Sequence, residues 1–405
     1  MLLGEIKTIP TIHNIVYLID ILKAIANDRD SFEEIRRTVA ESRRTIESKE
    51  RVAHSMGEKY LDAKDSDPSY MWNQSAKNLH ELMQLGLVKE RPLKYSFSSG
   101  DKVTAEPARR ETYELTEDGW HIARLAESHY DMTIYNVLEL MYKAHPKLRA
   151  FIDILQKNEV LFFPELTVET IEGVPIQPKE YIEYVCTLAA EQVQKRYGTE
   201  FDISEKDVAS NLENYVLARM QSTRAPRGSL ASFVLKAVNR GTKSLILAKK
   251  GLKVDIPSFE VMTNWVKQLR ICNFARGLPD MRGLTLYLTA YIKTDGELVV
   301  KRRTKEQVLY SVLEDIPKFF YQFKTKGSPW ASIYPIRAAV CFKNRIDDEV
   351  FDEIIRDIFY KRVSIDYKLA LETDLWSAPF RSTKPLTLNG EKKRNIISVY
   401  DWKGG

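Results

Sequence analysis

The stretch from Trp72 to Leu125 constrains the fold more than any other part of this 405-residue chain. Its first part, WNQSAKNLHELMQ, repeats apolar residues at the spacing of one helix face, and Gly86 then suits the left-handed conformation that often ends a helix. Two strands are predicted at LVKE and YEL, separated by a polar segment with several cations. A short helix that begins with a capping threonine is predicted at TEDGWHIARLA. The stretch therefore predicts a helix, a β-hairpin with a long loop and a second helix.

Two further helices are predicted before this stretch. TIHNIVYLIDILKAIAN carries apolar residues at helical spacing, and SFEEIRRTVA begins with two acids in its first turn, where the helix dipole favours them. The polar residues 41–67 predict a charged helix inserted before Asp67-Pro68.

The segment from Ser31 to Leu125 resembles the winged helix-turn-helix superfamily of bacterial DNA-binding domains. The resemblance is carried by LMQLGLVKE and YELTEDGWHIA, which are similar to the leucine-glycine-leucine turn, strand, wing and Tyr-x-Leu-Thr-x-x-Gly ending of many such regulators. It covers about a quarter of the chain, and the insertion between the two helices is longer than the usual turn. The resemblance implies that the helix near residues 69–85 enters the major groove of DNA.

Helical spacing about Leu79 places Trp72, Ala76, Leu82 and Met83 on the core side of that helix. The opposite side carries Asn73, Gln74, Lys77, Glu81 and Gln84, although any surface helix shows such a polar side and Glu81 would repel phosphate. By the resemblance, the base-reading residues would be Asn73, Gln74, Lys77 and Gln84, since Asn and Gln pair with adenine and Lys donates to guanine. The expected phosphate contacts of the wing are Lys94, Lys102, Arg109 and Arg110. Further phosphate candidates are Lys267, Arg270, Arg224, Arg227, Lys392 and Lys393.

Composition and charge limit the classes of protein to which this chain can belong. No apolar run approaches the roughly 18 residues that span a bilayer, and the first residues lack the features of a signal peptide. Three widely spaced cysteines cannot build a disulfide framework, so we expect a cytoplasmic protein without a membrane partner. Residues 1–130 hold 19 Lys+Arg and 22 Asp+Glu, a net charge of −3, so the total of +5 leaves +8 for the rest. Electrostatic attraction to DNA would therefore come from separate basic segments and not from the charge of a whole domain.

The sequence predicts an α+β, mainly helical chain in three regions. These are a winged helix-turn-helix domain over 1–130, a mainly helical region over 131–250 and an α/β region over 251–405. In the last region Asp295-Gly296 predicts a hairpin turn, residues 336–342 a strand and DDEVFDEIIRDIF a helix. Helices followed by a hairpin indicate either a second winged helix or an unrelated α+β domain. The tandem arrangement also resembles the recognition halves of some restriction enzymes, which string together several winged helices.

Catalytic motifs are sparse. All six histidines lie within the first 145 residues, which excludes a His-dependent triad or a Cys/His zinc site in the rest, and no phosphate-binding glycine loop occurs. We expect no metal and no cofactor. One enzymatic pattern remains: Asp366-Tyr367-Lys368 on a predicted strand, with Asp348, Asp352 and Asp357 upstream, is the acid-x-Lys pattern of Mg²⁺-dependent nucleases.

The expected function is non-catalytic binding of double-stranded DNA. The chain would be a transcriptional regulator or the DNA-recognition component of a bacterial defence, restriction or mobile-element system. Its rear part would carry a second DNA-contacting winged helix, or a surface for self-association or for binding a partner subunit. Two alternatives stay open: a nuclease that uses Asp366 and Lys368, and a winged-helix protein-interaction scaffold.

Overall fold

The structure is a computed structural model that describes residues 15–51, 68–91, 112–167, 177–222, 229–278, 281–293, 299–373, 386–388 and 392–401. It is mainly helical with small antiparallel sheets, in agreement with the expected α+β class. No helix among these residues is long and apolar enough to cross a membrane.

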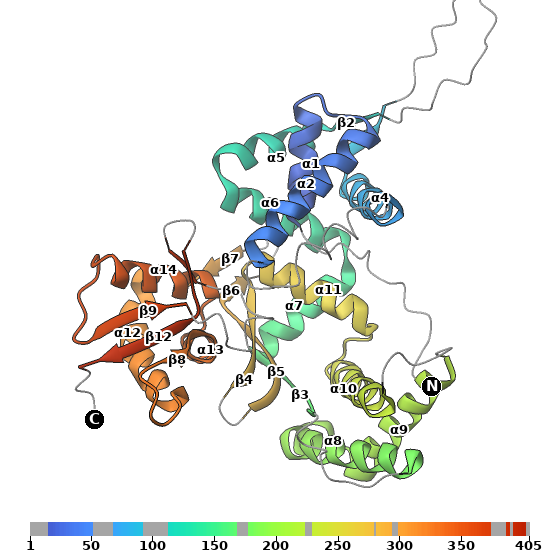
Figure 1. Ribbon diagram of the computed structural model, residues 1–405. Coiled ribbons are helices and arrows are strands. Elements are labelled where there is room, and N and C mark those ends of the chain that lie inside the picture. Colours follow the sequence, from blue (N-terminus) through green and yellow to red (C-terminus); the bar gives the residue numbers. More distant parts are fainter. Residues whose placement is uncertain are drawn as a thin grey trace, which may run out of the picture.

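The first group of elements, which we call unit 1, contains the helices and the hairpin expected from the sequence (Figure 1). Its elements are α1 (Val16–Ala26), α2 (Phe32–Arg51), α4 (Pro68–Gln84), β1 (Val88–Glu90), β2 (Tyr113–Leu115) and α5 (Glu117–Ser128). β1 and β2 pair antiparallel, and Ser31, directly before α2, forms an isolated antiparallel bridge with Thr112. Residues 52–67, which belong to the expected charged insertion, lie outside the described residues.

The Leu-Thr-x-x-Gly sequence holds α5 against the hairpin. Thr116 caps α5 by accepting a hydrogen bond from the Gly119 N–H (3.1 Å), and its hydroxyl donates to the carbonyl of Gly86 (2.7 Å). Gly86 has φ 72°, the left-handed conformation that favours glycine at a helix end. A Cβ on Gly119 would lie 2.0 Å from the carbonyl oxygen of Leu87, so only glycine allows this approach.

Replacing Gly119 with alanine is expected to destabilise unit 1 by about 1–3 kcal/mol, because the methyl group would push α5 away from the Leu87 carbonyl. Chemical denaturation followed by circular dichroism would measure the change. Gly198→Ala is the matched control, since a Cβ there meets only the flexible side chain of Gln194. It should leave stability unchanged or raise it by up to about 1 kcal/mol through helix propensity. Equal stability of the two variants would contradict the role given to Gly119.

The second group, unit 2, follows the connecting helix α6 (Tyr130–Ala144). Its elements are α7 (Pro146–Asn158), β3 (Val160–Pro164), α8 (Pro178–Phe201), α9 (Glu205–Ser222), α10 (Leu230–Lys249), α11 (Ile256–Gln268), β4 (Cys272–Leu278) and β5 (Met281–Leu288). The strands form a sheet in the order β3-β5-β4. A separate hairpin of β6 (Ala290–Lys293) and β7 (Val299–Arg302) confirms the pairing expected around Asp295-Gly296, although the turn itself lies outside the described residues.

The third group, unit 3, contains three helices and a second three-stranded sheet. Its elements are α12 (Lys305–Phe323), β8 (Ala331–Ser332), α13 (Ile333–Asn344), α14 (Asp348–Phe359), β9 (Lys368–Glu372), β10 (Leu386–Leu388), β11 (Lys392–Arg394) and β12 (Ile396–Tyr400). The main sheet has the order β8-β12-β9, and β10 pairs with β11. The strand expected over 336–342 is wrong. These residues belong to α13, whose buried residues Ile333, Ile336 and Val340 follow helical spacing.

The three units share one connectivity. Each contains the order helix, strand, helix, helix, strand, strand, and the last strand of this order pairs between the other two. In unit 1 the first strand is reduced to the Ser31 bridge, and in unit 3 the β10–β11 hairpin is inserted between β9 and β12. Unit 2 differs by the insertion of α8 and α9 after β3. In every unit a residue with positive φ lies two positions after the third helix: Gly86 (72°), Arg270 (57°) and Lys361 (56°). The next residue then donates to a carbonyl five positions back, at 2.9, 2.9 and 2.8 Å.

Units 1 and 2 agree in one more detail. Thr289, directly after β5, donates its hydroxyl to the carbonyl of Arg270 (2.9 Å), as Thr116 does to Gly86. The N–H groups of Thr116 and Thr289 donate to Leu87 and Ile271. The boundary expected between residues 250 and 251 falls inside unit 2, because β3 and β5 belong to one sheet.

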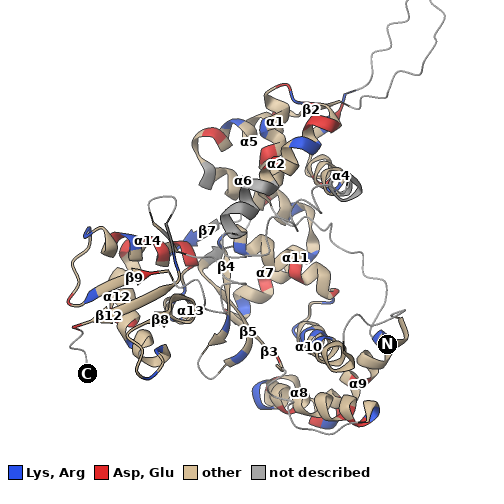
Figure 2. Cartoon of the chain, in the orientation of Figure 1, with Lys and Arg blue, Asp and Glu red and all other residues tan. Residues whose placement is uncertain are grey.

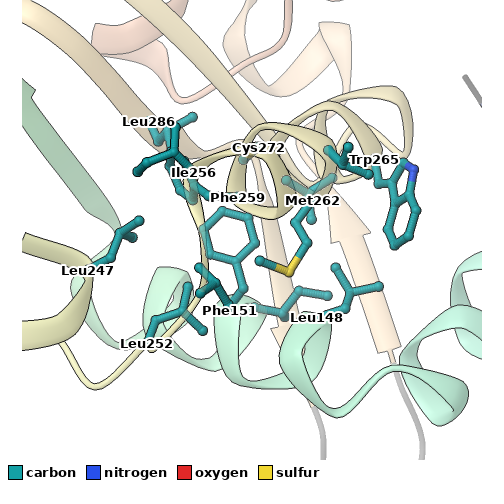
Figure 3. Packing of buried hydrophobic residues seen from close by; sticks show 14 of the residues in the cluster. Leu148, Phe151, Leu247, Leu252, Ile256, Phe259, Met262, Trp265, Cys272 and Leu286 are labelled. Atoms are coloured by element: carbon teal, nitrogen blue, oxygen red, sulfur yellow. The ribbon is translucent and has the colours of Figure 1, made fainter. Parts of the chain in front are cut away.

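The sheet of unit 2 lies between two hydrophobic cores. On one face Leu161, Phe163 and Leu286 join a core that includes α7, α10 and α11, part of which Figure 3 shows. On the other face Ala275 and Tyr287 join the core of unit 3. Figure 1 shows α13 beside β4, with unit 1 at the top of the view and α8–α10 at the bottom. Units 2 and 3 are therefore joined by buried apolar contacts.

Candidate nucleic-acid interface

The helix expected to read DNA is rotated relative to the sequence-based expectation. Lys77 and Gln84 are exposed, as expected. Gln74 is only 7% exposed, so its expected outward position is wrong, and Glu81 is completely buried. Met83, expected in the core, is 36% exposed. The side chain of Asn73 and the wing residues Lys94, Lys102, Arg109 and Arg110 lie outside the described residues.

On the side of α4 that is buried, one contact joins units 1 and 2. Glu81 Oε1 lies 2.6 Å from Nε2 of His145, the residue that precedes α7. The ring of His145 packs against the buried Trp265 of α11, with ring centroids 5.5 Å apart. Helical periodicity within residues 69–85 could not reveal this contact, because His145 is 64 residues away from Glu81.

The outer face of α4, which we define as Lys77, His80, Met83 and Gln84, contains no carboxylate. His80 Nε2 and Gln84 Nε2 lie 3.0 Å apart, so the two side chains form a hydrogen-bonded pair at the surface. This face thus offers one cation and two side chains with both donor and acceptor capacity. Sequence analysis missed His80, although its helical position beside Gln84 was a usable signal.

The corresponding helices of units 2 and 3 differ in charge. The exposed residues of α11 include Glu260 and Asn264, and those of α14 include Glu349 and Glu353. Carboxylates at these positions would repel the phosphates of a nucleic acid. Elsewhere Figure 2 shows Lys and Arg interleaved with Asp and Glu over the drawn helices. Of the third helices of the three units, α4 alone has an outer face of described side chains without an acid.

Lys267 and Arg270, expected as phosphate contacts, instead connect unit 2 to unit 3. Arg270 donates to both carboxylate oxygens of Asp347, from Nε at 2.8 Å and from a terminal nitrogen at 3.1 Å. The ammonium of Lys267 lies 3.5 Å from Asp348 and 3.9 Å from the ring centre of Phe274. Both cations have intramolecular partners, so we remove them from the candidate interface. Sequence analysis could not find these partners, since Asp347 is 77 residues from Arg270.

Arg224 and Arg227 lie outside the described residues, and β11 includes Lys392 and Lys393, whose side chains are not described.

Two residues of the nuclease pattern in unit 3, Lys368 and Asp352, lie in separate ion pairs, and Asp366 is exposed. Lys368 lies 2.8 Å from Asp401, and Asp352 lies 2.9 Å from Arg337. Within the described part of the chain no three His, Cys, Asp or Glu residues gather in a way that could hold a metal ion.

The three cysteines offer no reactive thiol. Burial raises the pKa of Cys186 and of Cys272 to about 12, and it raises the pKa of Cys341 well above its ordinary value. A nucleophilic cysteine requires the opposite shift, since the thiolate is the reactive form.

Comparisons of this chain with protein families, with curated proteins and with solved structures found no match.

Proposed function

We propose that this chain is a non-catalytic protein that binds double-stranded DNA through unit 1. The proposal treats each unit as a winged helix, in which the third helix is the element that contacts DNA. Its support is the shared order helix, strand, helix, helix, strand, strand, with the last strand in the middle of the sheet. The Leu-Thr-x-x-Gly ending of unit 1, which carried the resemblance, also has a structural reason in the contacts of Thr116 and Gly119.

One observation carries the choice of unit 1: the outer face of α4 presents Lys77, His80 and Gln84 without a carboxylate. A lysine can donate to guanine or to phosphate, and the glutamine amide can pair with adenine. The equivalent helices α11 and α14 expose Glu260, Glu349 and Glu353. In this proposal units 2 and 3 therefore form the support that carries unit 1.

The tandem arrangement favours a recognition component over a self-contained regulator. Several winged helices in one chain are similar to the recognition halves of some restriction enzymes. We therefore propose that the chain supplies DNA recognition to a defence, restriction or mobile-element system whose other chemistry lies elsewhere.

Fluorescence anisotropy with a mixed-sequence duplex tests the proposal. We expect binding that weakens steeply as salt is added, because protein cations release counterions from DNA. Lys77→Glu should weaken binding about tenfold, which is 1.4 kcal/mol. Lys326→Glu, a charge reversal at an exposed lysine of unit 3, should change affinity less than about twofold. Binding that does not depend on salt, or equal effects of the two reversals, would refute the proposed role of α4.

A further inference from the structure

Arg345 carries a half-buried charge for which the described part of the chain offers no counterion. The residue directly follows α13, in the turn before α14. Its Nη1 is shielded from solvent and has no hydrogen-bond acceptor among the described residues. No described carboxylate lies within 4.0 Å of its guanidinium. Burial without a partner is costly for a charged group, so this arrangement is unusual.

Other cations that the fold buries are paired with acids. The ammonium of Lys243 lies 2.6 Å from Glu165, and the guanidinium of Arg337 lies 2.9 Å from Asp352. An external anion could reach those cations only in competition with a carboxylate of the protein. At Arg345 an anion can bind without breaking an ion pair among the described residues.

Two aromatic rings hold the guanidinium of Arg345 at the junction of units 2 and 3. Its Cζ lies 4.6 Å from the ring centre of Phe342 on α13 and 5.9 Å from that of Tyr287 on β5. Tyr287 is completely buried, and its ring packs edge-on against Phe342 with centroids 5.3 Å apart. An arginine held over aromatic rings keeps its planar N–H donors available for an oxyanion.

A second guanidinium is fixed beside the first. Arg303, which precedes the capping residue of α12, donates from Nη1 to the carbonyl of Asn344 (3.0 Å), the residue before Arg345. The side chain of Asn344 is itself held by the buried Asp315, at 3.0 Å. The pKa of Arg345 is lowered mainly by burial; the exposed Glu159 opposes this shift, and the charge of Arg303 adds to it. The two cations therefore lie close together.

We propose that Arg303 and Arg345 form a site for a phosphate group, either inorganic phosphate or the terminal phosphate of a nucleotide or DNA strand. Such a group carries nearly two negative charges at neutral pH, which would balance the two guanidinium charges. Arginine forks also match the spacing of phosphate oxygens. The ligand would reach the open sides of the two groups, since Arg303 is exposed and Arg345 is only half-buried. The site lies outside α4 and does not require that unit 1 binds DNA.

Thermal unfolding of the full chain in inorganic phosphate, with chloride at equal ionic strength as the reference, tests the site. A ligand of the folded state raises the Tm, and phosphate also stabilises proteins nonspecifically, so the variants are compared with one another. Arg303→Gln and Arg345→Gln should each need about tenfold more phosphate for the same rise. Arg282→Gln, at an exposed arginine of β5, is the matched control and should respond like the wild type.

Two further comparisons separate a binding role from a structural one. Without phosphate, Arg345→Gln should be at least as stable as the wild type, because it removes a charge that lacks a counterion. Glu159→Gln removes a carboxylate that attracts Arg345 and should lower the phosphate concentration needed for the rise in Tm. Equal phosphate responses of the wild type and both arginine variants would overturn the proposal.

A binding measurement with DNA identifies the source of the phosphate. If a duplex with terminal phosphates binds more tightly than the same duplex with terminal hydroxyls, and Arg345→Gln removes the difference, the source is a DNA end. If the two duplexes behave alike while inorganic phosphate still stabilises the wild type more than Arg345→Gln, the source is a free phosphate compound. No response in either measurement would refute the site. Loss of DNA binding by Lys77→Glu leaves the phosphate response intact, so this proposal and the proposed function fail separately.

Discussion

Replacing Phe259 with alanine is expected to lower the free energy of unfolding by about 3–5 kcal/mol, the usual cost of truncating a buried aromatic residue. Phe259 is 1% exposed and projects from α11 into the core of unit 2 (Figure 3). Its ring makes edge contacts with Phe151 of α7 and Phe163 of β3, at centroid distances of 5.6 and 5.3 Å. Alanine would remove both ring contacts and leave a cavity where helix, helix and sheet meet.

Urea denaturation followed by circular dichroism would measure this loss. Phe359→Ala is the matched control, because Phe359 at the end of α14 is 39% exposed. We expect it to cost less than about 1 kcal/mol, since its truncation opens no enclosed cavity. A cost at Phe259 no larger than that at Phe359 would show that α11 does not pack in unit 2 as described.

Removing the carboxylate of Asp352 is expected to be comparably damaging, at about 3–5 kcal/mol, because it leaves a buried charge without its partner. Asp352 on α14 and Arg337 on α13 are 1% and 4% exposed, and their charged groups lie 2.9 Å apart. The pKa of Arg337 is raised although burial opposes its charged form, because Asp352 and then Asp348 attract the proton. Asp352→Ala should therefore destabilise unit 3 at every pH where the guanidinium stays charged.

Two further variants separate this effect from a general loss of packing. Glu353→Ala changes the neighbouring acid, whose contact with Lys305 is half-exposed, and should cost less than about 1 kcal/mol. The double variant Arg337→Met with Asp352→Leu replaces the pair by apolar groups and should recover most of the lost stability. Failure to recover it would show that the residues act through other partners.

Local sequence patterns predicted much of unit 1. The helices, the hairpin strands and the cap at Thr116 follow from periodicity and from residues with a strong local preference. The repeat of the unit was harder to recognise. In unit 2 the insertion of α8 and α9 separates β3 from α10, and in unit 3 the short strand β8 covers two residues. The apolar residues of α13 indicated a strand because a short apolar run fits both periods.

The orientation of α4 could not be predicted from its own residues. Periodicity assigns an amide and a carboxylate to the solvent side, whereas Gln74 is buried and Glu81 is buried beside His145 of unit 2. Lys267 and Arg270 show the same limit, because the acids that bind them follow more than seventy residues later. Contacts between units decide which polar side chains remain available for a partner, and those contacts leave no local signal.

The most direct test of the central claim is photo-crosslinking to duplex DNA from single positions of the full chain. A benzoylphenylalanine side chain in place of His80 reports on the outer face of α4, and the same group in place of Tyr310, which is 80% exposed on α12, is the control. We predict an ultraviolet-dependent protein–DNA adduct from position 80 that disappears at high salt, and none from position 310. Adducts from position 310 but not from position 80 would contradict the assignment of the DNA-binding surface to unit 1.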